Sequence, residues 1–201
     1  MSKPVVLILG PQGSGKSTQA IQLAEFLDYK FISTGQEVRK ASQAGNELSK
    51  KMDEFWKEGN LVPDSIIENE ILFPLMLSSG QHGFVIDGYP RNITQINNFL
   101  NFLDDQDWAI TYVFYLHVGE DECLKRLRSR SLIESRADES DESIKNRLNI
   151  FHKETEPLLV EYSNMGRLHR IDGERTVEDI QEDLRSYFSG VEFVEPTVED
   201  E

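Results

Sequence analysis

Short apolar runs rich in β-branched residues alternate along this chain with longer stretches in which apolar residues recur at helical spacing. The runs predict five strands, at Val5–Leu9, Lys30–Ile32, Phe84–Ile86, Tyr112–Leu116 and Leu168–Ile171. Strands that alternate with helices form a parallel sheet with helices on both faces. The pattern therefore predicts an α/β fold built on a five-stranded parallel sheet.

The helical stretches carry their own boundary signals. The first should open near Gly15, with its apolar-periodic stretch from Thr18 to Leu27, and the stretch from Ile144 to Tyr162 should kink or split at Pro157. Thr176 resembles a helix start, and that helix should run to about Ser189. The apolar positions that define the first helix are Ala20, Ile21, Ala24 and Leu27.

Composition limits the class of protein. The chain has 201 residues, of which 38% are hydrophobic and 28% charged, so we expect one soluble globular domain. No run approaches the ~20 apolar residues of a membrane span, and no signal peptide is visible.

The single cysteine, Cys123, fits a reducing compartment, so we predict a cytoplasmic protein. Its neighbours Leu124 and Leu127 make Cys123 a core residue, not a nucleophile.

The net charge of −15 argues against nucleic acid or an anionic membrane as partner, since both bind basic surfaces. Residues 191–201 form an acidic tail, which we expect to be a disordered, solubilising end. Basic residues are most concentrated between Lys125 and Arg136, at Lys125, Arg126, Arg128, Arg130 and Arg136.

The strongest motif is Gly10-Pro11-Gln12-Gly13-Ser14-Gly15-Lys16-Ser17, which matches the P-loop pattern G-x-x-x-x-G-K-[ST] between a strand and a helix. Its glycines let backbone N–H groups curl around a phosphate, and the helix that follows adds the positive end of its dipole. Lys16 supplies a mobile charge for the β- and γ-phosphates, and the Ser17 hydroxyl can ligate Mg²⁺. The motif predicts a nucleoside triphosphate site.

A second constellation follows the third strand, where Asp87 ends the apolar run and Gly88-Tyr89-Pro90-Arg91 comes next. An aspartate beside a P-loop can hold a water of the Mg²⁺ shell. Gly88 permits close backbone approach, and the Arg91 guanidinium suits bidentate phosphate binding. Ligands bind at the carboxyl ends of parallel strands, so both constellations should share one edge of the sheet.

Several segments in the same order resemble the adenylate kinases of the nucleoside monophosphate kinase family. Ile32–Arg39 resembles I-S-T-G-D-x-x-R, Gly59–Asp64 resembles G-x-L-V-P-D, and Asp87–Gln95 resembles D-G-F-P-R-x-x-x-Q. The pattern R-x-D, then R-L, then T-x-P is matched from Arg136 to Pro157. The resemblance extends from Val5 to about Phe188.

The resemblance implies a P-loop kinase core with two insertions. Residues 1–190 would form the kinase domain, with the core at 1–32, 63–130 and 138–190. A helical insertion at 33–62 would bind the monophosphate, and a short loop at 131–137, between two helices, would be the lid. Long-lid members carry about thirty more residues, often with a cysteine cluster for zinc; this chain has neither, so no structural zinc is expected.

The family's roles carry over where positions match. The implied reaction is MgATP + AMP ⇌ 2 ADP, carried out by a monomer with Mg²⁺ as its cofactor. The expected catalytic residues are Lys16, Asp87, Arg91, Arg130, Arg136 and Arg147. The expected ATP-binding residues are Gly13, Ser14, Gly15, Lys16, Ser17, Thr18, Arg126, Arg130 and Arg175. The expected AMP-binding residues are Thr34, Arg39, Val62, Gly88, Arg91, Gln95, Arg136 and Arg147. Ser17 and, through water, Asp87 would hold the Mg²⁺.

Two other functions stay open at this point. A UMP/CMP kinase would share Asn92, although Thr34 and Gln95 favour adenine. A P-loop regulatory module that holds ATP without transferring phosphate would not need Arg39, Arg91 and Gln95 on the acceptor side. A degenerate paralogue is disfavoured by the intact Lys16, Asp87, Arg91 and Arg147.

Overall fold

A single parallel sheet organises the molecule. The computed structural model describes residues 2–57, 62–133 and 141–189. The strands are β1 (Lys3–Leu9), β2 (Lys30–Ser33), β3 (Phe84–Asp87), β4 (Trp108–His117) and β5 (Leu168–Asp172). They lie in the order β2-β3-β1-β4-β5, and every neighbouring pair is parallel. The predicted α/β fold with a five-stranded parallel sheet is therefore confirmed.

Helices fill the connections between the strands, and another follows the last strand. They are α1 (Lys16–Leu27), α2 (Thr34–Gln43), α3 (Glu47–Lys57), α4 (Asp64–Ile66), α5 (Phe73–Leu77), α6 (Ile93–Asp105), α7 (Glu120–Ile133), α8 (Asp141–Ile150), α9 (Leu158–Asn164) and α10 (Val177–Ser186). Two segments have the wider π-helical turn, η1 (Ile67–Leu72) and η2 (Phe151–Thr155). No helix in the described part of the chain is both long and apolar enough to cross a membrane.

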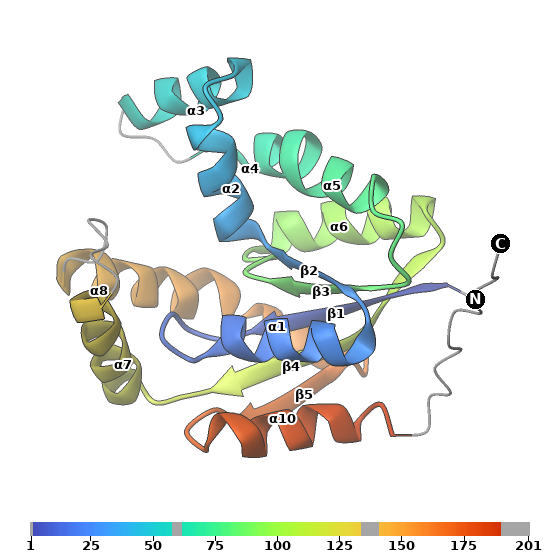
Figure 1. Ribbon diagram of the computed structural model, residues 1–201, viewed down its shortest axis with the longest axis vertical. Coiled ribbons are helices and arrows are strands. Elements are labelled where there is room, and N and C mark those ends of the chain that lie inside the picture. Colours follow the sequence, from blue (N-terminus) through green and yellow to red (C-terminus); the bar gives the residue numbers. More distant parts are fainter. Residues whose placement is uncertain (1, 58–61, 134–140, 190–201) are drawn as a thin grey trace, which may run out of the picture.

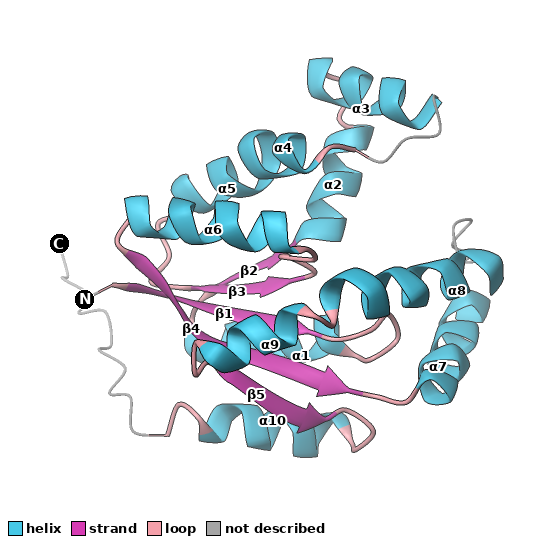
Figure 2. Ribbon diagram, turned by 180° about the vertical axis from the view of Figure 1, so that it is seen from behind, coloured by secondary structure: helices cyan, strands magenta, loops and turns pink. Residues whose placement is uncertain are grey.

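The sheet separates two apolar clusters, because alternate residues of each strand point to opposite faces. Val5 and Leu7 of β1 pack with α5, α6 and α9, whereas Val6 and Ile8 pack with α1 and α10. Figure 1 and Figure 2 show these two helical layers on either side of the strands. Residues 5–9 are buried on both faces, which explains the unbroken apolar run of the sequence.

The predicted helices are present with small differences. The helix α1 begins at Lys16, as predicted, with Gly15 as its N-cap in the left-handed conformation. Ile21 is 38% exposed, so its assignment to the apolar face was wrong. Leu23 is buried instead, because it completes the i, i+3, i+4 spacing with Ala20 and Ala24. A new helix begins after Pro157, and Thr176 caps α10 by accepting from the Asp179 N–H.

Two small clusters extend the core toward the carboxyl ends of the strands. Met52, Val62 and Ile71 join α3 to η1, and Cys123, Leu127 and Leu148 join α7 to α8. The predicted lid loop at 131–137 is wrong in its first three residues, because α7 continues to Ile133. Neither Gly nor Pro interrupts the sequence there, and Leu132 and Ile133 are compatible with a helix. Residues 134–137, like the tail at 191–201, lie outside the described residues.

Candidate active site

Glycine geometry shapes the loop between β1 and α1. Gly13 and Gly15 have φ of 88° and 86°, which side chains rarely adopt. A Cβ on Gly13 would lie 2.7 Å from the backbone oxygen of Cys123 in α7, so the loop fits closely against that helix. A Cβ on Gly15 would meet nothing within 4 Å. Gly15 therefore serves the backbone turn alone, while Gly13 serves the turn and the packing.

This loop lines one side of a partly open cavity of about 230 Å³ at the start of α1. Lys16 is half-buried, and its Nζ donates to the Pro11 carbonyl at 3.1 Å, which folds the side chain back over the loop. Six predicted ATP-binding residues line the cavity together with Gln12 and Leu127: Gly13, Gly15, Lys16, Ser17, Thr18 and Arg126. Ser14, which belongs to the same loop, is buried.

Asp87 joins this cavity to β3. The strands β1 and β3 are neighbours, with Ile8 opposite Asp87, so the carboxylate comes to the foot of the P-loop. The Ser17 hydroxyl donates to Asp87 Oδ2 at 2.5 Å. Asp87 is 4% exposed, and no group in the described residues donates to its Oδ1. A buried carboxylate oxygen that lacks a donor, beside a hydroxyl, is an arrangement of hard oxygen ligands suited to Mg²⁺.

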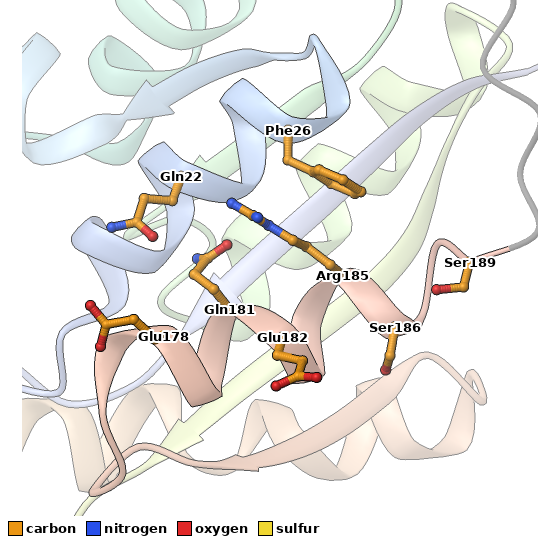
Figure 3. Close-up of a pocket in the computed structure, with 8 residues that line it drawn as sticks. All are labelled: Gln22, Phe26, Glu178, Gln181, Glu182, Arg185, Ser186 and Ser189. Carbon is orange, nitrogen blue, oxygen red and sulfur yellow. The ribbon is translucent and has the colours of Figure 1, made fainter.

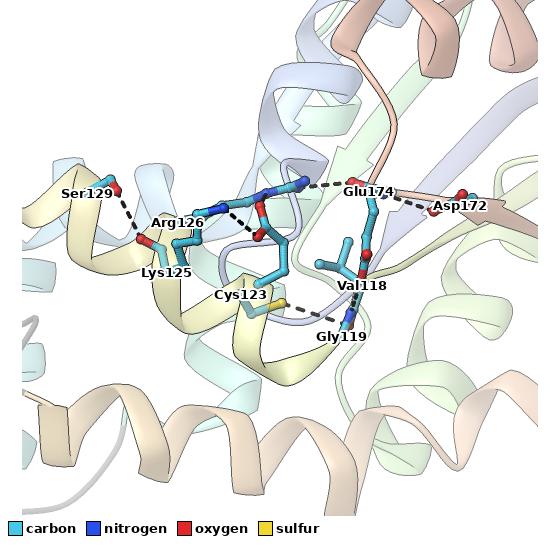
Figure 4. A network of polar contacts seen from close by, with 10 residues as sticks. Val118, Gly119, Cys123, Lys125, Arg126, Ser129, Asp172 and Glu174 are labelled. Atoms are coloured by element: carbon cyan, nitrogen blue, oxygen red, sulfur yellow. Dashed lines mark hydrogen bonds and ion pairs between the residues drawn. The ribbon is translucent and has the colours of Figure 1, made fainter.

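Arg126 is fixed on the other side of the cavity. Its Nε donates to Glu122 at 2.8 Å, and one terminal nitrogen donates to the Gly173 carbonyl at 2.9 Å. Figure 4 shows this arginine between α7 and the loop that follows β5, where Glu174 accepts from the Gly119 N–H. The guanidinium is held as a flat, half-buried surface at the edge of the cavity, which suits stacking against a planar ligand.

Cys123 lies in the same region, as a buried residue of the core. Its side chain is fully buried, and its thiol donates weakly to the Val118 carbonyl at 3.9 Å. Burial raises the pKa of the Cys123 thiol to about 11. A thiol with that pKa is protonated at neutral pH and a poor nucleophile, so the prediction of a core residue is confirmed.

The loop after β3 carries a second basic centre. Gly88 has φ of 81°, and the Arg91 side chain folds back so that its Nε donates to the Gly88 carbonyl at 2.6 Å. A Cβ placed on Gly35 of α2 would lie 3.6 Å from Arg39 Nη1 and 4.0 Å from Arg91 Nη2. The two guanidinium groups therefore face one point beside the first turn of α2, where an anion would be favoured.

Three other predicted acceptor residues surround this centre. Thr34 opens α2 and is 5% exposed, and its hydroxyl has no hydrogen-bond partner in the described residues. Val62 is buried in the small cluster between α3 and η1. Gln95 lies in the first turn of α6, where its Oε1 accepts from the Arg91 N–H at 2.7 Å.

The polar residues that support this loop were not predicted from the sequence. Asp64 accepts from Asn92 at 2.9 Å and from Gln95 at 2.7 Å, and Asn92 caps α6. The Thr155 hydroxyl donates to the Arg91 carbonyl at 3.0 Å. Asp64 and Thr155 belong to the segments that resemble the family, and that was the only signal that could have found them.

Glu68 is a second unpredicted carboxylate in the same support. It is 2% exposed and accepts from the Tyr89 hydroxyl at 2.9 Å and from Asn98 at 2.8 Å. Burial, and then the bonded Glu68, raise the pKa of Tyr89, so the hydroxyl stays protonated and donates. The Tyr89 ring lies edge-on to Phe99 at 5.2 Å, which fixes the loop to α6. The hydroxyl gives this loop a bond to Glu68 that phenylalanine could not make.

Some predicted residues lie elsewhere or outside the described part. Arg175 follows β5, pairs with Asp183 of α10 and does not line the cavity. The structure does not describe Arg136, nor the side chains of Arg130 on α7 and Arg147 on α8. The roles predicted for these residues stay predictions.

A larger hollow of about 520 Å³ lies between α1 and α10 (Figure 3). Arg185 lies over the Phe26 ring at 4.9 Å, and Glu178 and Glu182 add negative charge along α10. None of the predicted site residues lines this hollow. We therefore place the candidate active site at the smaller cavity, where the predicted phosphate-binding residues gather.

Comparison with known proteins agrees with this geometry. The family model described as adenylate kinase matches residues 8–167. The chain is 34% identical to an adenylate kinase of Micrococcus luteus over 89% of this chain and 87% of that protein. It is 35% identical to those of Thermobifida fusca and Prochlorococcus marinus, over 87% and 91% of this chain and 93% and 97% of theirs.

Proposed function

This chain belongs to the adenylate kinase family, and we propose that it transfers the γ-phosphoryl group of ATP reversibly to AMP, with Mg²⁺, to give two ADP. The observation that carries the proposal is the hydrogen bond from Ser17 to Asp87. This bond joins the P-loop to the end of β3, and the loop that follows β3 carries Arg91. The donor and acceptor centres thus meet at one edge of the sheet.

The donor side would bind ATP through backbone groups. The N–H groups of residues 13–18 and the start of α1 favour the phosphates, and Lys16 adds its charge. Arg126 would lie against the adenine at the edge of the cavity, as its fixed orientation supports. We propose that Arg130, on the same helix α7, also binds the phosphates of ATP.

The acceptor side would bind AMP through side chains. Arg39 and Arg91 face one point and would hold the phosphate of AMP. Thr34, Val62, Gly88 and Gln95 would form the rest of the monophosphate site. Gln95 would read the base through its amide, while Arg136 and Arg147 would clamp the transferred group.

Phosphoryl transfer needs alignment and charge neutralisation more than covalent catalysis. The AMP phosphate is already an anion, so no general base is required. Lys16 and the arginines would stabilise the negative charge that spreads over the transferring group. Water would compete as acceptor, so the insertion at 33–62 and the lid are proposed to close before the reaction.

Ser17 and Asp87 are the residues that would hold Mg²⁺, Asp87 through water. The metal ion would neutralise the phosphates of ATP and orient them. No group of three His, Cys, Asp or Glu side chains gathers at a possible metal site in residues 2–57, 62–133 and 141–189. A nucleotide-bound Mg²⁺ does not require such a group, because phosphate oxygens and water complete its shell.

A coupled assay of ADP formation, with ATP and each of AMP, UMP, CMP and GMP in turn, tests the proposal. We expect turnover with AMP to exceed that with the other acceptors and to stop when Mg²⁺ is chelated. Preference for a pyrimidine monophosphate would indicate a UMP/CMP kinase. ATP hydrolysis that is independent of any monophosphate would indicate a regulatory P-loop module. The monomeric state and the cytoplasmic location stay predictions.

A further inference from the structure

The contacts around Gln95 fix the direction of its side-chain amide. The Asp64 carboxylate can only accept hydrogen bonds, so the group that faces it at 2.7 Å must be the Gln95 NH₂. The Arg91 backbone N–H can only donate, so the group that faces it at 2.7 Å must be the Gln95 oxygen. Both neighbours impose the same orientation.

Asp64 is itself held in place. Its second carboxylate oxygen accepts from Asn92 Nδ2 at 2.9 Å, and the Asn92 oxygen caps α6 by accepting from the Gln95 backbone N–H at 2.9 Å. Asn92 therefore cannot turn its amide without losing the cap. The three side chains hold one another through these hydrogen bonds, in each of which a donor faces an acceptor, and Gln95 is 5% exposed among them.

One hydrogen on Gln95 Nε2 and one lone pair on Oε1 remain for a ligand. A 6-aminopurine such as adenine offers an acceptor at N1 and a donor at its amino group, which complements this pair. A 6-oxopurine offers the reverse, a donor at N1–H and an acceptor at O6. A freely turning amide could satisfy either base, whereas a fixed amide satisfies only one.

We propose that Asp64 is a positioning residue for acceptor specificity, which holds the Gln95 amide in the one direction that fits a 6-aminopurine and excludes a 6-oxopurine. This inference rests on the proposed function, in which Gln95 faces the base of the acceptor. A 6-oxopurine would place its N1–H against the Gln95 NH₂ and its O6 against the Gln95 oxygen. Two buried pairs of like groups cost more binding free energy than one missing contact, and this difference produces the discrimination.

The test is Asp64→Asn, measured as kcat and KM for AMP and for inosine monophosphate, which differ at N1 and at position 6 of the base. The asparagine has the shape of aspartate but presents one donor, so either Gln95 or Asn92 loses its acceptor. We expect the ratio of kcat/KM for AMP over inosine monophosphate to fall by roughly tenfold or more, as the loss of one such hydrogen bond implies. KM for AMP should rise while kcat changes little.

The matched control is Glu68→Gln, one helical turn along the same segment. Glu68 is buried and hydrogen-bonded to Tyr89 and Asn98, so its replacement also perturbs a buried carboxylate. It does not contact the Gln95 side chain amide, so the ratio between the two acceptors should stay at the wild-type value even if thermal stability falls. A purely structural role for Asp64 would leave the ratio unchanged in both variants.

The outcomes separate the two proposals. If the wild-type protein shows no AMP-dependent ADP formation, the proposed function fails and this inference fails with it. If the wild-type protein uses AMP but Asp64→Asn keeps the ratio, or Glu68→Gln lowers it equally, the function stands and only the role of Asp64 is overturned.

Discussion

The donor and acceptor sides of this site are built by different means. The donor side is built mainly on one continuous loop, in which glycines place backbone N–H groups, and most residues that line its cavity lie between Gln12 and Thr18. The acceptor side is a set of side chains from α4, η1, α6 and η2 that hold one another. Backbone geometry can be recognised in a short motif, but a network of side chains cannot.

The two sides also differ in how a single change should propagate. The P-loop should keep its shape when a neighbouring side chain is removed, because that shape depends on the φ and ψ angles of the loop itself. A closed network of buried polar groups is sensitive at every member, because the loss of one partner leaves another unsatisfied. Variants on the two sides should therefore fail in different ways.

The largest effect is expected on the donor side for Lys16→Met. This substitution removes the mobile positive charge at the cavity but leaves the glycines of the P-loop unchanged. We therefore expect kcat to fall by roughly 10³-fold with little loss of folding stability. Steady-state kinetics and urea unfolding measure the two quantities. The control is Lys30→Met, exposed at the amino end of β2, which should keep wild-type kinetics. A fall of less than tenfold for Lys16→Met would remove this lysine from the reaction.

A smaller and more selective effect is expected on the acceptor side for Arg91→Ala. The loss of a charged partner for the AMP phosphate should raise KM for AMP on the order of 100-fold, while ATP affinity stays near the wild-type value. Separate titrations with AMP and with a non-hydrolysable ATP analogue measure this. Arg167→Ala, exposed just before β5, serves as the control. Equal weakening of both ligands would contradict the division into two sides.

The smallest effect concerns two glycines of one loop. Both have positive φ, so Gly13→Ala and Gly15→Ala should each cost about 1 kcal/mol from backbone strain. Gly13→Ala adds a clash with the Cys123 carbonyl and should cost about 1–2 kcal/mol more. Urea unfolding of both variants measures the difference, with Gly15→Ala as the reference. Equal destabilisation would mean that the P-loop does not pack closely against α7.

Much of the fold was predictable from the sequence, because the strands are short apolar runs and parallel strands buried on both faces have that pattern. The P-loop was predictable because its glycines, lysine and serine are adjacent. The burial of Ile21 and the end of α7 were mispredicted. Helical spacing alone does not fix where a helix ends, nor which residue at the border of its apolar face is buried.

The sequence by itself determined the α/β class, the phosphate-binding loop, and the residue types available on the acceptor side. Only the tertiary structure decided that β3 lies beside β1, so that Ser17 reaches Asp87, and that Asp64 meets Gln95 across 31 positions of the chain. The physical reason is that backbone conformation depends on adjacent residues, whereas hydrogen bonds between side chains depend on which segments the folded sheet brings together.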